Sequence, residues 1–295
     1  MKTKKAGTFG RKISLLNLVA QSGIIVTGAI VRLTGSGLGC PTWPDCAPGS
    51  LIPVASQVEG FHKYIEFGNR LLTFLVLAIS ILLFVYSIFN KKPKIVFWSS
   101  LPLIGTLLQA VLGGITVLTG LNPLTVMAHF LVSIILVAIS VKIYDFYSPI
   151  KNSNKVSKIM DNYIQIITLV GFLVIVLGTI TTGSGPHSGD EIAARFNLDV
   201  RTVAWVHADL VLLFIGLLIG LFILTKVISD ANYLNRNVKI LLIICFVQGF
   251  IGYVQWFSNV PWILVSFHVL GAVVTWISIV YLALNSSNFF FKRLK

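Results

Sequence analysis

The chain has 295 residues, of which 56% are hydrophobic and 11% are charged, and its mean hydropathy is +0.88. A soluble protein of this length could not bury so much apolar surface, so the composition excludes a soluble enzyme and predicts a polytopic membrane protein. The net charge of +13 comes from basic residues that lie mostly between the apolar segments, so it does not indicate a nucleic-acid partner.

Eight apolar segments follow one another along the chain, and each is near the roughly 20 residues that cross a hydrocarbon core of about 30 Å. We therefore predict an all-α membrane protein with eight spans. They cover residues 13–33, 63–89, 95–118, 123–146, 162–182, 202–225, 238–257 and 262–284. No small-residue cleavage site follows the first span, so we expect this span to be retained and not removed as a signal peptide.

The basic residues are divided unevenly between the two sides of this arrangement. Eighteen of the 23 Lys and Arg residues fall on one side, and the other five are Arg32, Lys63, Arg70, Arg195 and Arg201. By the positive-inside rule we expect a multi-pass protein of the cell membrane with both termini in the cytoplasm. The basic excess then reflects topology, aided by anionic lipid.

The loop after the first span reads Gly-Cys-Pro-Thr-Trp-Pro-Asp-Cys and holds Cys40 and Cys46 on the outer side. Two thiols six residues apart in an oxidising compartment indicate a disulfide or an exchangeable redox pair. Zinc is disfavoured, because the loop offers no further ligand beyond Asp45. Arg32, just before this loop, either neutralises a bound carboxylate such as a propionate or extends to lipid headgroups.

The second span carries four polar residues on one helical face: His62, Glu66, Asn69 and Arg70 are spaced at i, i+4, i+7 and i+8. This spacing predicts that they point at a common partner. An ionisable group such as Glu66 is costly inside a membrane, so we take it as a candidate catalytic residue. The alternative is an ion pair between Glu66 and Arg70 at the interface.

A Gln-x-x-x-Gly pattern occurs twice, beginning at Gln109 and Gln248, and each is followed twenty residues later by a histidine, His129 or His268. Both copies cross a short polar break between two apolar segments. Buried imidazoles cost free energy unless something binds them. The duplicated pattern therefore indicates a bound metal or haem.

The polar linker near residues 151–158 divides the chain into an N-terminal bundle, 1–150, and a C-terminal bundle, 151–295, with four spans each. Aligning the second and sixth spans places Asn69 opposite His207. At 1.5 Å per residue, His207 and His268 both lie about 10 Å inside the outer boundary. Facing imidazoles at one level suit ligation of a haem iron, and two bundles suggest two such sites.

The cysteine-containing loop, the run Ile-Glu-Phe-Gly-Asn-Arg in the second span, and single histidines in spans four, six and eight together resemble the haem A synthase family. The likeness covers nearly the whole chain. It implies eight helices in two pseudo-symmetric four-helix bundles. It also implies oxidation of the C8 methyl group of haem O to a formyl group, which gives haem A, through two dioxygen-dependent hydroxylations and loss of water from the gem-diol.

The resemblance further implies roles for individual residues. His207 and His268 match the pair that ligates the iron of a haem b cofactor, and His129 matches the ligand of the N-terminal, substrate-side haem. Glu66 matches the glutamate of a Glu-x-x-His motif. The paired loop cysteines would form a disulfide that is reduced during turnover or one that braces the loop.

One departure from the family pattern concerns the second span, where Asn69 stands in place of the histidine. The N-terminal haem is then held by His129 alone, which leaves its iron open to dioxygen, or His62 supplies the other ligand. Arg32 and Arg70 are further candidates for contact with the haems.

The resemblance implies haem O as the substrate, with haem O synthase and terminal oxidase assembly proteins as partners beside membrane lipid; a homo-oligomer stays open. Two other classes compete with the enzyme. A cytochrome b-type electron carrier would need the bis-histidine site but not Glu66. A transporter is disfavoured, because its polar sites would lie near the membrane midplane, and here they cluster near the outer face.

Overall fold

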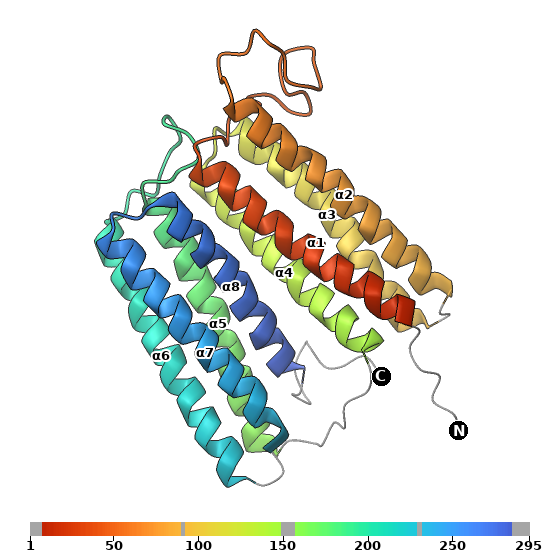
Figure 1. Cartoon of the computed structure of the whole chain (residues 1–295), viewed down its shortest axis with the longest axis vertical. Helices are drawn as coiled ribbons and strands as arrows, with labels where there is room; N and C mark the ends of the chain where they lie inside the picture. The colour runs from red at the N-terminus through yellow and green to blue at the C-terminus, as the bar shows by residue number, and fades with distance from the viewer. Residues whose placement is uncertain (1–7, 90–91, 149–156, 229–231, 285–295) are drawn as a thin grey trace.

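The computed structural model describes residues 8–89, 92–148, 157–228 and 232–284, and it contains eight long helices in this part of the chain (Figure 1). Each of them is long and apolar enough to cross a membrane, which confirms the predicted all-α fold. They are α1 (Thr8–Leu33), α2 (His62–Phe89), α3 (Pro93–Leu118), α4 (Pro123–Tyr147), α5 (Lys158–Ser184), α6 (Val200–Val227), α7 (Asn232–Phe257) and α8 (Trp262–Ala283). Of the linker at which the two halves were divided, residues 151–156 lie outside the described residues.

The two halves pack their helices in the same way. In the first, α1 contacts α2 and α4, and α3 contacts the same two helices, so α2 and α4 face each other diagonally across a square. In the second, α5 and α7 each contact α6 and α8, which places α6 and α8 on the diagonal. This is the arrangement of a four-helix bundle, in which facing helices present side chains to a shared interior.

Local sequence explains where the helices begin and turn. Pro93 and Pro123 stand in the first turns of α3 and α4, where a missing N–H costs nothing. Asn122 caps α4 through a bond from Leu124 N, and Asp199 caps α6 through a bond from Thr202 N. Gly35, with a φ of 68°, turns the chain sharply after α1.

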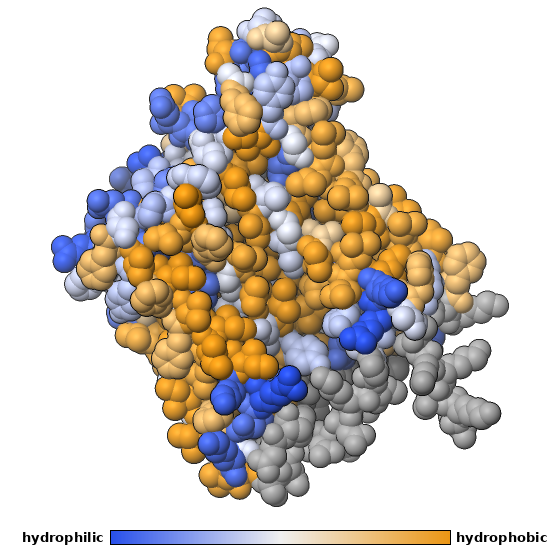
Figure 2. All heavy atoms as spheres, viewed as in Figure 1, coloured by the Kyte–Doolittle hydropathy of each residue, from blue (hydrophilic) through white to orange (hydrophobic). Residues whose placement is uncertain are grey.

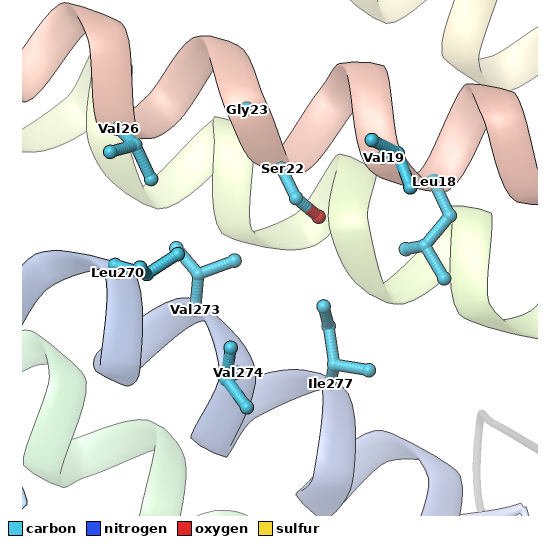
Figure 3. A pocket seen from close by; sticks show the side chains of 9 residues that line it. All are labelled: Leu18, Val19, Ser22, Gly23, Val26, Leu270, Val273, Val274 and Ile277. Carbon is cyan, nitrogen blue, oxygen red and sulfur yellow. The ribbon is translucent and has the colours of Figure 1, made fainter.

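The bundles meet through α1 and α4 of the first and α5 and α8 of the second. At this junction the Trp276 indole N–H of α8 donates to the Ile134 carbonyl of α4 over 2.8 Å. Beside it, α1 and α8 leave an apolar cavity of about 270 Å³, into which the Ser22 hydroxyl points (Figure 3). Hydrophobic residues cover the middle of the visible face, and hydrophilic ones gather near its ends (Figure 2).

Candidate functional site

The interior of the C-terminal bundle holds an imidazole from each of two diagonal helices, His207 on α6 and His268 on α8. The other two helices contribute glycines where these rings lie. A β-carbon on Gly178 of α5 would come 3.2 Å from Cε1 of His207, and one on Gly252 of α7 would come 3.5 Å from Cε1 of His268. Small residues on α5 and α7 thus make the space that the two rings occupy.

The N-terminal bundle repeats this arrangement with one substitution. His129 of α4 lies against Gly113 of α3, at 3.4 Å between the ring Cε1 and a β-carbon built on the glycine. Asn69 of α2 lies against Gly28 of α1, at 3.8 Å from its amide nitrogen. Asn69 therefore occupies the position that His207 has in the other bundle, as the alignment of the two spans predicted.

Two of the three histidines share an unusual feature: the Nδ1 atoms of His129 and His268 are buried without a hydrogen-bond partner among the described residues. A buried unpaired polar atom costs free energy, so such atoms indicate something that the protein alone does not provide. Imidazoles from diagonal helices, with glycines between them, fit a flat iron-bearing macrocycle that inserts between the helices. His207 and His268 in one bundle and His129 in the other are the residues that would hold such a group.

The glutamine of each Gln-x-x-x-Gly pattern supports the helix that carries the histidine. The Gln109 amide donates to the His129 carbonyl over 2.8 Å and also to the Ser133 hydroxyl. In the C-terminal bundle, the Gln248 amide fills the space beside Gly271 that any side chain there would need. The pattern is therefore structural: the glutamine fixes the partner helix, and the glycine makes room for the ring.

Arg32 lies at the outer junction of the two bundles. Its Nη2 donates to the Thr182 carbonyl at the end of α5 over 3.0 Å, while its Nε is buried without a partner in the described part of the molecule. A cation with a free donor at this depth can hold a carboxylate, such as a propionate of a macrocycle bound in either bundle.

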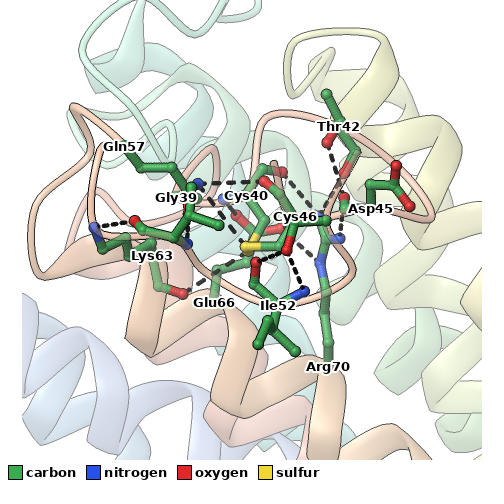
Figure 4. Close-up of a disulfide and its surroundings, with 12 residues drawn as sticks. Gly39, Cys40, Thr42, Asp45, Cys46, Ile52, Gln57, Lys63, Glu66 and Arg70 are labelled. Carbon is green, nitrogen blue, oxygen red and sulfur yellow. Dashed lines mark hydrogen bonds and ion pairs between the residues drawn. A yellow bond between two sulfur atoms is a disulfide. The ribbon is translucent and has the colours of Figure 1, made fainter. Parts of the chain in front are cut away.

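The outer loop between α1 and α2 is closed by a disulfide between Cys40 and Cys46, as the cysteine spacing predicted (Figure 4). Arg70 fastens this loop to α2. Its guanidinium donates to the carbonyls of Cys40 over 2.8 Å and of Thr42 and Asp45 over 3.0 Å each. These bonds leave Arg70 less able than Arg32 to hold an additional carboxylate.

Glu66 is buried beneath this loop. One carboxylate oxygen accepts from the Cys40 N–H over 2.6 Å, and the other accepts from Arg70 at 2.7 Å and 3.1 Å. The carboxylate thus forms the ion pair that the sequence left open as an alternative, and it also binds the loop backbone at the disulfide.

The four polar residues of α2 do not share one partner, although their spacing predicted it. The His62 ring is exposed and bonds the Ser36 hydroxyl over 2.8 Å, whereas Asn69 accepts from the Thr27 hydroxyl of α1 over 2.8 Å. Glu66 and Arg70 face the loop instead. A helical face is wide enough for residues at i and i+7 to meet different neighbours, and the structure does not bring His62 to the site.

Gly28 and Gly178 are site residues that the sequence reading missed. A signal for them exists, because each stands in the same short pattern, Val-x-Gly-x-Ile, in the first and fifth spans. Once the bundles are known to be duplicated, a glycine repeated at matched positions indicates a place where helices must leave room for a neighbour.

Comparison with known proteins gives a match over most of the chain. The family model COX15-CtaA, described as cytochrome oxidase assembly protein, matches residues 11–280. Proteins named "Heme A synthase" are similar over shorter segments: that of Geobacillus thermodenitrificans is 32% identical over 36% of this chain and 32% of its own, and that of Bacillus pumilus is 34% identical over 42% and 40%. The one from Shouchella clausii is 29% identical over 52% of this chain and 53% of its own. The matched segments thus span about a third to a half of these relatives' lengths.

Proposed function

Because the chain belongs to the COX15-CtaA family of cytochrome oxidase assembly proteins, we propose that it is a membrane oxidoreductase that converts haem O to haem A. The reaction oxidises the C8 methyl group of haem O to a formyl group. The single observation that carries this proposal is the repeated arrangement in the interiors of the two bundles. One bundle contains two imidazoles, His207 and His268, and the other contains His129 opposite Asn69.

The difference between the two bundles matches two different tasks. In the C-terminal bundle, His207 and His268 would hold a haem b cofactor, which would supply electron transfer. In the N-terminal bundle, His129 would hold the substrate haem from one side only. The amide of Asn69, kept in place by the Thr27 hydroxyl, would leave room for dioxygen beside the substrate.

The chemistry requires two successive hydroxylations. Each inserts one oxygen atom of dioxygen into a C–H bond of the methyl group and releases the other atom as water, with two electrons and two protons consumed. The gem-diol formed by the second step loses water to give the formyl group. The bound haem b would supply the electron transfer that these steps need, and the chain's residues bind, orient and enclose the substrate.

The residues of the outer end would position and cover the substrate. Arg32, which has a free buried donor, would hold a propionate at the junction of the bundles. Glu66 and Arg70 would keep the disulfide loop closed over the N-terminal bundle and so limit the entry of water. Glu66 thus acts in this proposal as a positioning residue.

The proposal includes the setting of the protein. We expect it in the cell membrane with both termini in the cytoplasm, since the basic residues gather on that side. Haem O synthase would provide its substrate, and terminal oxidases would use its product.

Extraction and separation of haems from membranes tests the proposal. Cells that make haem O should contain haem A only when this protein is present. The variant Glu66→Gln should lower the yield of haem A, because it removes the charge that holds Arg70 and the loop. An electron carrier with the same bis-histidine site would leave the haem types unchanged in both comparisons, and that result would replace the enzyme assignment.

A further inference from the structure

A layer of hydrogen-bonded polar side chains crosses the N-terminal bundle well inside the membrane. The amide of Asn17 on α1 donates to the Ser140 hydroxyl of α4 over 2.9 Å and accepts from the Ser80 hydroxyl of α2 over 3.1 Å. All three side chains are fully buried. Each lies eleven residues, or about 16 Å, inward from the site residue of its own helix (Gly28, Asn69 and His129).

Further polar groups lie between this layer and the site. The amide of Gln21 on α1 donates to Ser80 over 3.4 Å and to the Thr106 hydroxyl of α3 over 3.0 Å. One turn outward on α3, Gln109 contacts Ser133 and the backbone of His129. We refer to Asn17, Gln21, Ser80, Thr106 and Ser140, together with Gln109, as the polar column.

Three more buried serines lie between the column and the inner ends of the helices, and two of them, Ser14 and Ser87, donate to carbonyls of their own helices. Ser14 on α1, Ser87 on α2 and Ser99 on α3 are each fully buried within the bundle. The hydroxyl of Ser99 has no hydrogen-bond partner in the described part of the structure. Polar groups therefore occur at successive levels from the inner end of the bundle to the site.

The C-terminal bundle shows that the fold does not require this column. Eleven residues inward from Gly178, His207 and His268 lie Ile167, Leu218 and Ile279, and all three are buried in an apolar core. The same level of the same architecture is thus polar in one copy and apolar in the other. Buried polar groups in a membrane span are costly, and they often mark ion or proton pathways.

We propose, on the basis of the proposed function, that the polar column carries protons from the inner side of the membrane to the N-terminal site. The two bundles differ in their need for protons. Each hydroxylation at the N-terminal site consumes two protons and two electrons, whereas a haem that only relays electrons consumes no proton. Within the column, the Ser80 hydroxyl donates to the Asn17 amide and accepts from the Gln21 amide, whereas the Ser140 and Thr106 hydroxyls accept from these amides and donate to carbonyls of their own helices. Hydroxyls both donate and accept hydrogen bonds, so a proton passes along the column when these hydroxyls exchange their partners.

The structure of the outer end of the N-terminal bundle supports the supply of protons from the inner side. The disulfide loop covers it, and the Glu66 carboxylate and the Arg70 guanidinium beneath the loop are bonded to each other and to the loop backbone. The column instead leads away from this loop, toward the opposite end of the bundle, where α1 begins at Thr8.

Proton uptake measured separately on each side of a membrane tests the proposal. The haem-loaded protein is reconstituted in lipid vesicles, in preparations with either face outward and with a pH-sensitive dye trapped inside. Turnover is started with haem O, dioxygen and hexaammineruthenium(II), which supplies one electron and no proton. Protons should disappear from the compartment that faces the inner side of the wild-type protein.

The triple variant Asn17→Leu/Ser80→Ala/Ser140→Ala removes the layer without leaving one member unpaired, so it should fold and keep its haem absorption. Uptake and haem A formation should both slow on the order of tenfold or more. Thr168→Val is the matched control in the C-terminal bundle, because the buried Thr168 hydroxyl bonds the Ile164 carbonyl of its own helix and lies outside the polar column. This control should change neither quantity.

Two results would overturn the proposal that the polar column carries protons. One is wild-type protein that forms haem A while drawing protons from the outer compartment. The other is a triple variant that loses thermal stability but takes up protons at the wild-type rate, which would make the layer structural only. Either result leaves the proposed function intact. Membranes that contain haem O and this protein but no haem A would overturn the proposed function, and the column with it.

Discussion

Gly178 and His207 lie against each other so closely that a β-carbon on the glycine would be 3.2 Å from Cε1 of the ring. The two residues come from adjacent helices, α5 and α6. The absence of a side chain at Gly178 is therefore what allows the imidazole to point into the bundle. The same relation holds between Gly252 and His268 on α7 and α8.

A larger side chain at Gly178 should displace the His207 ring. Gly178→Val adds two methyl groups beyond the close β-carbon, and overpacking of this kind costs about 1–3 kcal/mol. We expect the variant to lose most of its haem b, measured as haem per protein after purification. Gly249→Val is a suitable control, because a β-carbon at Gly249 meets nothing within 4 Å. Equal haem contents in the two variants would contradict the role given to the glycine.

The proposed histidine ligands of a haem b can be tested by truncation. His207→Ala or His268→Ala should each remove the low-spin haem absorption, because iron bound on one side only does not keep the bis-imidazole spectrum. His187→Ala serves as the control. That ring lies in the loop between α5 and α6 and bonds the Val260 carbonyl over 2.8 Å. An unchanged spectrum in either of the first two variants would remove the assignment.

Substitution of Asn69, the residue that differs between the two bundles, tests the proposal that one bundle holds a cofactor haem and the other holds the substrate. Asn69→His should give the N-terminal site a second imidazole, since Gly28 already provides the space beside it. The expected result is a second low-spin haem signal and at least about a tenfold fall in haem A formation, because both sides of the iron are then occupied. A variant that gains the signal but keeps full activity would show that dioxygen does not need the position facing Asn69.

The eight spans could be predicted because apolar length is a property of the sequence alone, and the observed helices differ from the predicted spans by a few residues at most ends. It could also be predicted that Asn69 and His207 occupy equivalent positions in the two bundles, because the spacing of these residues is repeated in the two halves of the sequence. The separate partners of His62, Glu66 and Asn69 could not, because they depend on which loop or helix folds against each side of α2. The polar layer around Asn17 could not be predicted either, because its members come from three helices and no local sequence pattern connects them.

The last prediction concerns pH and a group outside the membrane spans. Asp199 caps α6, where its carboxylate accepts from the Thr202 N–H over 2.8 Å and from the Thr202 hydroxyl over 2.6 Å. These bonds favour the charged form, so they lower the pKa of Asp199 below its ordinary value.

A lowered pKa means that the folded protein binds this proton less tightly than the unfolded chain does. The stabilisation by Asp199 is therefore fully present above the unfolded pKa of about 3.9, and it is lost as the pH falls through the lower, folded pKa. Thermal unfolding in detergent between pH 7 and pH 3 should show this loss in the wild type. Asp199→Asn should keep the cap without this titration, because asparagine caps helices equally well, and Asp199→Ala should be less stable throughout. If Asp199→Asn loses stability below pH 4 as steeply as the wild type, another carboxylate is responsible for the acid sensitivity.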